Sequence, residues 1–113
     1  MNENVWVARY TAAGVLDASF SGDGLFKRDF ASSSYDEPRE LRFDSSGRIV
    51  VAGRAGDDAF VMRLTTGGAL DSTFSGDGVL LHHESSSSIE YTGMDLQSDD
   101  KIVVASTSLG FVQ

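Results

Sequence analysis

The sequence contains two histidines, which stand together in His82-His83-Glu84. Imidazole and carboxylate groups are zinc ligands, so this cluster is a candidate metal site. The surrounding residues predict a strand, and neighbouring side chains of a strand point to opposite faces. Because both imidazoles cannot easily reach one metal from a single chain, we expect the pair to lie on an outer strand without a metal.

Two Gly-Asp-Gly loops, Gly22–Gly24 and Gly76–Gly78, could offer oxygen ligands to calcium together with nearby Asp17 or Asp71. The spacing does not match an EF-hand loop, and an aspartate in a tight turn commonly bonds its own backbone. The loop also recurs, whereas a specific ligand site would need only one copy. We therefore predict structural turns and no metal.

Paired carboxylates, Glu37 with Glu40 and Asp57 with Asp58, could supply an acid and a base for catalysis. A hydrolase also needs a shaped pocket and shifted pKa values, which spacing does not indicate. The sequence has no Gly-x-Ser-x-Gly, phosphate-loop or dinucleotide motif. We therefore predict no catalytic residues and no cofactor, and keep a hydrolase or lyase as an alternative.

The amino-acid composition disfavours several classes of binding partner. The 113 residues include 17 acidic and 9 basic side chains, and a formal net charge of -8 disfavours nucleic acid and anionic membranes as partners. There is no cysteine, which excludes disulfides and thiolate chemistry. No apolar run approaches the roughly 18 to 20 residues of a membrane span, and the first residues lack an export signal. Localisation stays open, with the cytoplasm as the default.

The sequence repeats itself. The string LDASFSGDG at 16–24 returns as LDSTFSGDG at 70–78, and VWVARYTAAG at 5–14 matches AFVMRLTTGG at 59–68, both at an offset of 54. RIVVA at 48–52 matches KIVVA at 101–105 at an offset of 53. The chain is therefore interpreted as a single unit of two repeats, about 5–58 and 59–113.

Short runs of branched and aromatic residues, separated by Gly, Ser and Asp turns, predict an all-β fold with four strands per repeat. We expect strands at 5–10, 25–30, 38–43, 48–53, 59–65, 79–83, 91–96 and 101–106, with a ninth stub at 110–113. Ser46-Gly47 and Asp99-Asp100 predict tight hairpin turns. The apolar runs at 49–52 and 102–105 do not alternate, so we expect both faces of these strands to be covered, as in stacked propeller blades.

The string ARYTAAGVLDASFSGDG, followed by a short strand and DSSGRIVVAG, resembles the bacterial delta-60 repeat, a relative of NHL and kelch blades. The resemblance implies two four-stranded β-propeller blades. It lends a fold and no catalytic residues. Ser21 and Ser75 stand where that family commonly has a further glycine.

The resemblance implies that each blade has strands a to d, with the strand before the Ile-Val-Val run innermost and the strand after Gly-Asp-Gly outermost. The chain then begins and ends inside a blade, with strand order c-d, a-b-c-d, a-b and a fragment of c. A propeller needs about four to eight blades to close. We therefore expect a head-to-tail homo-oligomer in which the c-d strands of one chain complete the a-b strands of the next, with a trimer of six blades preferred. The alternative is a fragment of a longer propeller without independent activity.

The function predicted is a non-enzymatic binding or assembly module with an acidic, Ser-rich loop face around the channel. This face would suit a sugar, a cation or a basic peptide, and the alternative is a set of solvated connectors. Arg42 and Asp95 fall at matching positions of the inner strands and suggest a belt of alternating charge. The candidate ligand-binding residues are Tyr35, Asp36, Glu37, Arg42, Arg54, Asp57, Asp58, Glu90, Tyr91 and Asp95.

Overall fold

The computed structural model describes residues 4–30, 36–85 and 87–110, which form eight strands and no helix. The strands are β1 (Val5–Ala8), β2 (Leu25–Arg28), β3 (Asp36–Phe43), β4 (Ile49–Ala55), β5 (Asp58–Leu64), β6 (Val79–His82), β7 (Ser87–Leu96) and β8 (Ile102–Gly110). The all-β prediction is confirmed, and each of the eight expected strands is present. Of the expected ninth stub, Gly110 ends β8 and 111–113 lie outside the described residues. In the described residues there is no helix long and apolar enough to cross a membrane.

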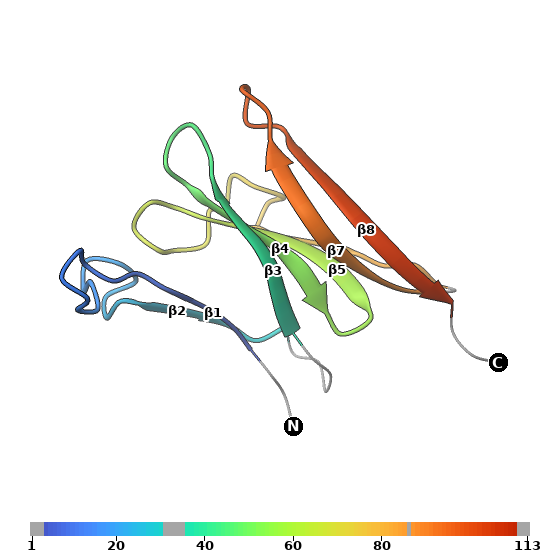
Figure 1. Cartoon of the computed structure of the whole chain (residues 1–113), viewed down its shortest axis with the longest axis horizontal. Helices are drawn as coiled ribbons and strands as arrows, with labels where there is room; N and C mark the ends of the chain where they lie inside the picture. The colour runs from blue at the N-terminus through green and yellow to red at the C-terminus, as the bar shows by residue number, and fades with distance from the viewer. Residues whose placement is uncertain (1–3, 31–35, 86, 111–113) are drawn as a thin grey trace.

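The strands form three antiparallel sheets in the orders β1-β2, β3-β4-β5-β6 and β7-β8. Figure 1 shows the four-stranded sheet lying between the two smaller ones. This middle sheet takes β3 and β4 from the first sequence repeat and β5 and β6 from the second. By the repeat offsets, β1-β2 corresponds to β5-β6, and β7-β8 corresponds to β3-β4.

Two apolar layers hold the sheets together. One lies between β1-β2 and the middle sheet and includes Val5, Phe20, Phe60 and Met62. The other lies between the middle sheet and β7-β8. The run at 49–52 serves both layers, because alternate side chains of a strand face opposite sides. Ile49 and Val51 join the first layer, and Val50 and Ala52 join the second.

The matching run at 102–105 behaves differently. Ile102 and Val104 pack against the layer shared with the middle sheet, whereas Val103 is 52% exposed. The expectation of cover on both faces therefore holds for β4 and holds for only one face of β8. The cause is that β7-β8 has a neighbouring sheet on one side only among the described residues.

The innermost strands share an irregularity that the sequence did not reveal. The β3–β4 register shifts between Pro38 and Glu40, and the β7–β8 register shifts between Tyr91 and Gly93. These are matching positions of the two repeats, so each inner strand carries a β-bulge at one place. The residues at the bulges are Arg39 and Thr92.

The Gly-Asp-Gly loops are turns, as predicted. Asp23 accepts a hydrogen bond from the Leu25 backbone N–H at 2.9 Å, and Asp77 accepts one from Val79 at 3.0 Å. Ahead of each turn, an arginine donates to an aspartate of the connecting loop. Arg9 donates to Asp17 at 2.9 Å, and Arg63 donates to Asp71 at 2.8 Å.

Candidate functional site

The unpaired strand edges of the two small sheets include one edge of β1 and one edge of β8. Within the described ranges β1 pairs only with β2, and β8 pairs only with β7. An unpaired edge presents backbone N–H and C=O groups that can pair with a further strand. The two edges are complementary, because one small sheet has the two outer strands of a four-stranded unit and the other has the two inner strands.

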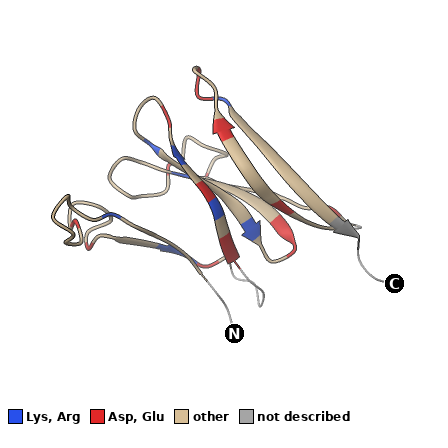
Figure 2. Ribbon diagram, in the orientation of Figure 1, with Lys and Arg blue, Asp and Glu red and all other residues tan. Residues whose placement is uncertain are grey.

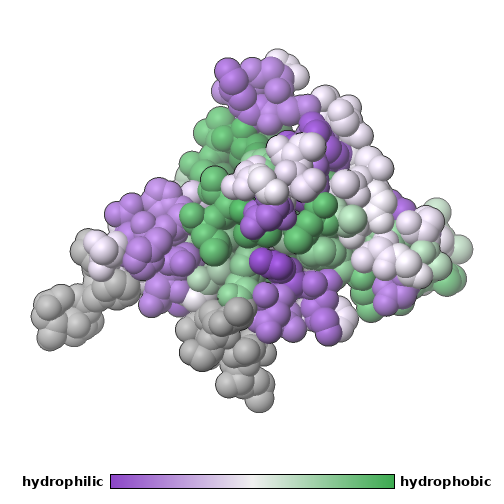
Figure 3. Space-filling view, turned by 180° about the vertical axis from the view of Figure 1, so that it is seen from behind, coloured by the Kyte–Doolittle hydropathy of each residue, from purple (hydrophilic) through white to green (hydrophobic). Residues whose placement is uncertain are grey.

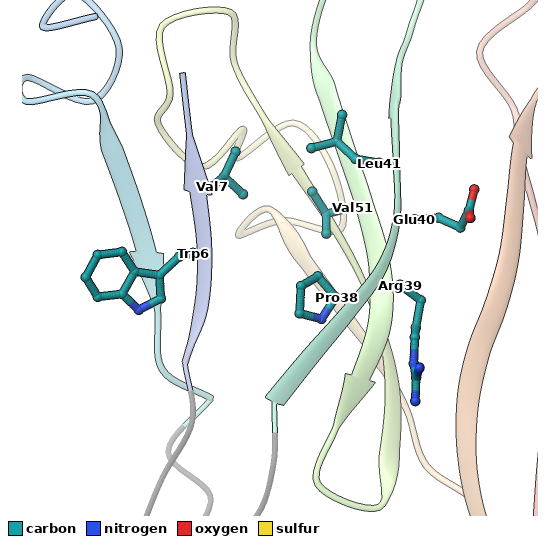
Figure 4. Close-up of a pocket in the computed structure, with 7 residues that line it drawn as sticks. All are labelled: Trp6, Val7, Pro38, Arg39, Glu40, Leu41 and Val51. Atoms are coloured by element: carbon teal, nitrogen blue, oxygen red, sulfur yellow. The ribbon is translucent and has the colours of Figure 1, made fainter. Parts of the chain in front are cut away.

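A cleft lies beside β1 and opens toward β3 and β4 (Figure 4). Its lining comes from Trp6, Val7, Pro38, Arg39, Glu40, Leu41 and Val51. Figure 4 shows Trp6 and Val7 on opposite sides of β1, with Val7 directed toward the middle sheet. Arg39 and Glu40 leave β3 on the side of β7.

A second cleft lies beside β8, lined by Val61, Phe74, Leu80, Tyr91, Ile102 and Val104. The two clefts have volumes of about 240 and about 200 Å³. Small-molecule sites commonly have volumes of about 300 to 1,000 Å³ and use a few convergent polar groups. These clefts are smaller and mainly apolar, which suits side chains of an added strand better than a drug-sized ligand.

Matching positions of the two repeats differ sharply in exposure. Val50 is 1% exposed and its counterpart Val103 is 52% exposed. Met94 is 6% exposed and its counterpart Leu41 is 41% exposed. Seen from behind, apolar side chains gather in the middle of the molecule with hydrophilic ones around them (Figure 3). Large apolar patches of this kind mark interaction surfaces.

Polar side chains link the middle sheet to β7-β8. Arg39 Nη2 lies 3.0 Å from Glu90 Oε2 and 3.3 Å from Glu37 Oε1, which joins β3 to β7. Acidic and basic residues alternate along β3 at this point (Figure 2). At the opposite end of the strands, Asp100 accepts hydrogen bonds from the Ser45 backbone N–H at 2.8 Å and from Ser45 Oγ at 2.6 Å.

Arg48 occupies the centre of this second link. Its Nε donates to Asp44 Oδ2 at 2.6 Å, and its other nitrogens lie 3.7 Å from Asp71 and 3.6 Å from Asp100. Hydrogen bonds from Ser45 hold the pKa of Asp100 below its usual value, and Arg48 acts in the same direction. Hydrogen bonds from Thr73 lower the pKa of Asp71.

The predicted ligand-binding residues divide into two groups. Asp36, Glu37, Arg54, Asp57, Asp58 and Glu90 gather at one end of β3, β4, β5 and β7. Glu37 lies opposite Arg54 in the β3–β4 register, and Ile89 donates its N–H to the Asp57 carbonyl at 3.0 Å. Asp36 is buried, and burial raises the pKa of its carboxyl group. Tyr35 lies outside the described residues.

The other three predicted residues lie elsewhere. Tyr91 is buried in the second apolar layer, and burial raises the pKa of its hydroxyl group. Arg42 pairs with Glu40 of its own strand at 2.8 Å, and Asp95 accepts the backbone N–H of Leu96 at 2.9 Å. The ion pair that joins neighbouring inner strands is therefore Arg39–Glu90, at a position that the sequence did not single out.

Neither histidine lines either cleft, although the His82 ring lies 6.4 Å from the ring of Tyr91, which lines the second one. His82 lies at the end of β6 with its Nε2 2.8 Å from Glu84, and His83 Nδ1 lies 2.7 Å from Asp58 Oδ1. The two imidazoles thus have different carboxylate partners. In the described residues no group of three or more potential ligands is placed to hold a metal ion.

Residues 45–74 match a family model described as a domain of unknown function (DUF5122) beta-propeller. The match supports a β-propeller repeat family. It covers β4, β5 and the turn that follows β5, which are the centre of the middle sheet. No curated protein and no solved structure matches the chain.

Proposed function

We propose that the chain is a non-enzymatic binding and assembly module, in which copies built from two delta-60-like repeats join into a closed β-propeller. Each copy would complete the half-sheet of its neighbour. The observation that supports this most directly is the complementarity of β1-β2 and β7-β8, which together have the strands of one four-stranded unit.

The middle sheet supplies the template for the joint. There β4 pairs with β5, and Ala52 lies opposite Val61. Their counterparts by the repeat offsets are Ala105 on β8 and Val7 on β1. The proposal therefore pairs β8 of one copy with β1 of the next, with Ala105 opposite Val7.

The same template accounts for the exposed apolar side chains. Val50 and Met94 lie in one buried cluster between the middle sheet and β7. Their counterparts are the exposed Val103 and Leu41. In the proposed assembly Val103 of one copy covers Leu41 of the next, which removes from water two apolar groups that a single copy exposes.

Three copies would give six sheets, within the usual range of about four to eight blades. The loop end that holds Glu37, Asp57, Asp58 and Glu90 would then rim the channel. Its acidic side chains support a cation or a basic peptide as ligand, and hydroxyl groups support a sugar. Neither cleft contains a histidine, so the hydrolase or lyase alternative has no support from them.

The mass of the protein in solution tests the assembly. Light scattering on eluting protein at micromolar concentration should give a multiple of 12.1 kDa, with three times that value preferred. Val103→Lys should lower the mass to that of a single chain, because it puts a charge into the joint. Leu81→Lys is the matched control, since Leu81 is 53% exposed and lies outside the proposed joint.

A wild-type mass of 12.1 kDa at every concentration would overturn the proposal and favour a fragment of a longer propeller. Equal masses for the two lysine variants and the wild type, all multimeric, would show that copies associate through another surface. The folded state of each variant is checked by its far-ultraviolet circular dichroism.

A further inference from the structure

The exposed loop at 11–14 corresponds to the loop at 65–68, which packs against Phe20 and Ser21 within the chain. We propose that Thr11–Gly14 of one copy docks onto Arg63, Phe74 and Ser75 of the preceding copy, whose β8 pairs with its β1, an inference that rests on the proposed assembly. It goes further by naming the two segments that would recognise each other. One internal contact that the chain already makes is the template for this docking.

That internal contact joins the turn after β1 to the loop after β5. Ser21 donates its backbone N–H to the Gly67 carbonyl at 2.8 Å, and Arg9 Nη1 donates to the Thr66 carbonyl at 2.9 Å. Phe20 lies beneath Gly68 and is completely buried. A side chain at Gly68 would bring its Cβ to 2.8 Å from the Phe20 ring, so the loop needs glycine there.

The second repeat builds the same receptor and leaves Ser75 exposed and Phe74 partly exposed, although the Arg63 side chain is only 12% exposed. Arg63 donates to Asp71 at 2.8 Å and to Thr73 at 3.1 Å, as Arg9 does to Asp17 at 2.9 Å and to Ser19 at 3.1 Å. These two sets of bonds engage Nε and Nη2 of each arginine. Among the described residues, Nη1 of Arg63 has no hydrogen-bond partner corresponding to the Thr66 carbonyl.

The turn residues of the receptor also correspond. Ser21 has a φ of 55° and Ser75 a φ of 54°, so both backbones turn in the same way and aim their N–H groups alike. The guanidinium of Arg9 lies 4.9 Å from the Phe20 ring centre, and that of Arg63 lies 5.1 Å from the Phe74 ring centre. Phe74 remains partly exposed, whereas Phe20 is buried.

The first repeat builds the matching loop and leaves it exposed. Gly14 donates to the Thr11 carbonyl at 2.9 Å, and Gly68 donates to the Thr65 carbonyl at 3.0 Å. The φ values of Gly14 and Gly68 are 87° and 89°. Gly68 is buried under its partner and Gly14 is exposed. Both surfaces are therefore already in the bound shape, which lowers the entropic cost of docking.

The expected contacts follow from the offset of 54. Arg63 Nη1 would donate to the Ala12 carbonyl, and the Ser75 N–H would donate to the Ala13 carbonyl. Gly14 would lie against the Phe74 ring. The recognition uses backbone carbonyls and one glycine, so it selects the shape of the loop rather than its side chains.

Gly14→Ala tests the docking, with Gly22→Ala as its control. The two glycines have φ values of 87° and 84°, and a Cβ at either would meet nothing within 4 Å in a single copy. The backbone strain of the two variants is therefore matched. Only at Gly14 would the added methyl collide with Phe74 of the neighbouring copy, and we expect its assembly to weaken by about ten- to a hundredfold relative to Gly22→Ala.

A disulfide provides a second readout, because the chain has no cysteine of its own. Ala13→Cys combined with Ser75→Cys should give disulfide-linked chains of two or more copies on a non-reducing gel. The internal pair Ser21→Cys with Gly67→Cys should close within one chain, and Ala18→Cys with Ser75→Cys should not link chains at the same rate.

The outcomes separate this inference from the proposed assembly. One outcome is a multimeric protein in which Gly14→Ala assembles as strongly as Gly22→Ala and the Ala13→Cys, Ser75→Cys variant does not link chains. The docking is then wrong and the assembly stands. If the protein is a single chain at all concentrations, both are wrong. Weakened assembly of Gly14→Ala together with linked chains supports both.

Discussion

Asp100 adopts a φ of 67° and accepts two hydrogen bonds from Ser45, so one hairpin turn is tied to the turn of the neighbouring sheet. The counterpart of Asp100 in the first repeat is Gly47, with a φ of 81°. The second repeat therefore keeps the turn that glycine would allow and adds a carboxylate that reaches across to the next sheet.

Asp100→Asn should lower the urea midpoint of unfolding. Asparagine tolerates positive φ, so the turn survives, but the carboxylate that accepts from both Ser45 groups and faces Arg48 is lost. Asp99→Asn is the control, because Asp99 is exposed and contacts only Lys101 among charged partners in the described residues. A midpoint for Asp100→Asn equal to that of Asp99→Asn would show that the Ser45 contact contributes nothing to stability.

Stability should fall as the pH drops below about 3.8, the ordinary aspartate pKa. Hydrogen bonds hold the pKa values of Asp17, Asp71 and Asp100 below that value in the folded protein. A lowered folded pKa gives stability that is present above the unfolded pKa and is lost as pH falls through the folded pKa. Urea unfolding between pH 2 and pH 6 measures this loss.

Asp71→Asn serves as the test of the cause, and its unfolding midpoint should depend less on pH than that of the wild type. An unchanged slope would assign the acid sensitivity to other groups. The comparison is made at concentrations low enough for single chains, so that association does not contribute.

Asp36→Asn should raise stability at pH 7 and have little effect at pH 3. Burial raises the pKa of Asp36 in the folded protein, so the ionised carboxylate is disfavoured there. Ionisation of Asp36 therefore lowers the free energy of unfolding as the pH rises through its folded pKa. Asparagine keeps an oxygen that can accept the Phe30 N–H, which now donates to Asp36 at 3.1 Å. Loss of stability at pH 7 would mean that the charge of Asp36 has a stabilising partner in the folded protein.

Phe20→Ala should destabilise a single chain by about 3–5 kcal/mol, the usual cost of removing a fully buried phenylalanine. Phe74→Ala should cost less, because its ring remains partly exposed. Urea unfolding of the two variants compares matching positions of the two repeats. If their costs are equal in dilute solution, Phe74 is as well covered as Phe20 within one copy.

The dependence on protein concentration gives a second comparison of Phe20→Ala and Phe74→Ala. In the proposed assembly Phe74 gains a neighbouring copy, so the cost of Phe74→Ala should grow with protein concentration while that of Phe20→Ala stays constant. A constant difference between the variants at all concentrations would count against burial of Phe74 by a second chain.

The eight strands were predictable because the repeat shows each strand twice and the turns carry suitable residues. The non-alternating run at 49–52 correctly indicated a strand with cover on both faces. The same pattern at 102–105 could not show that one face is open in a single copy. Local sequence records the preference of a strand for cover, whereas the presence of cover depends on which sheets are neighbours.

The site was harder to predict than the fold. Glu37 and Glu90 were singled out by charge and loop position, but Arg39, which lies between them, was not, because a bulge in β3 shifts the register there. Periodicity assigns faces by counting residues, and an inserted residue breaks the count. Tyr91 was predicted among the ligand-binding residues of the channel and loop face and is instead buried, since it lies on the face of β7 that packs against the middle sheet.

The links Arg39–Glu90 and Ser45–Asp100 occur at the junction inside the chain. At a junction between copies with the same geometry, their places would be taken by Thr92 with Glu37 and by Ser98 with Gly47. Such a junction would have no charged side chain to match Arg39 or Asp100. Raised ionic strength should then loosen the interior of each subunit while subunit exchange continues at nearly the same rate, so the two kinds of junction can be told apart by salt alone.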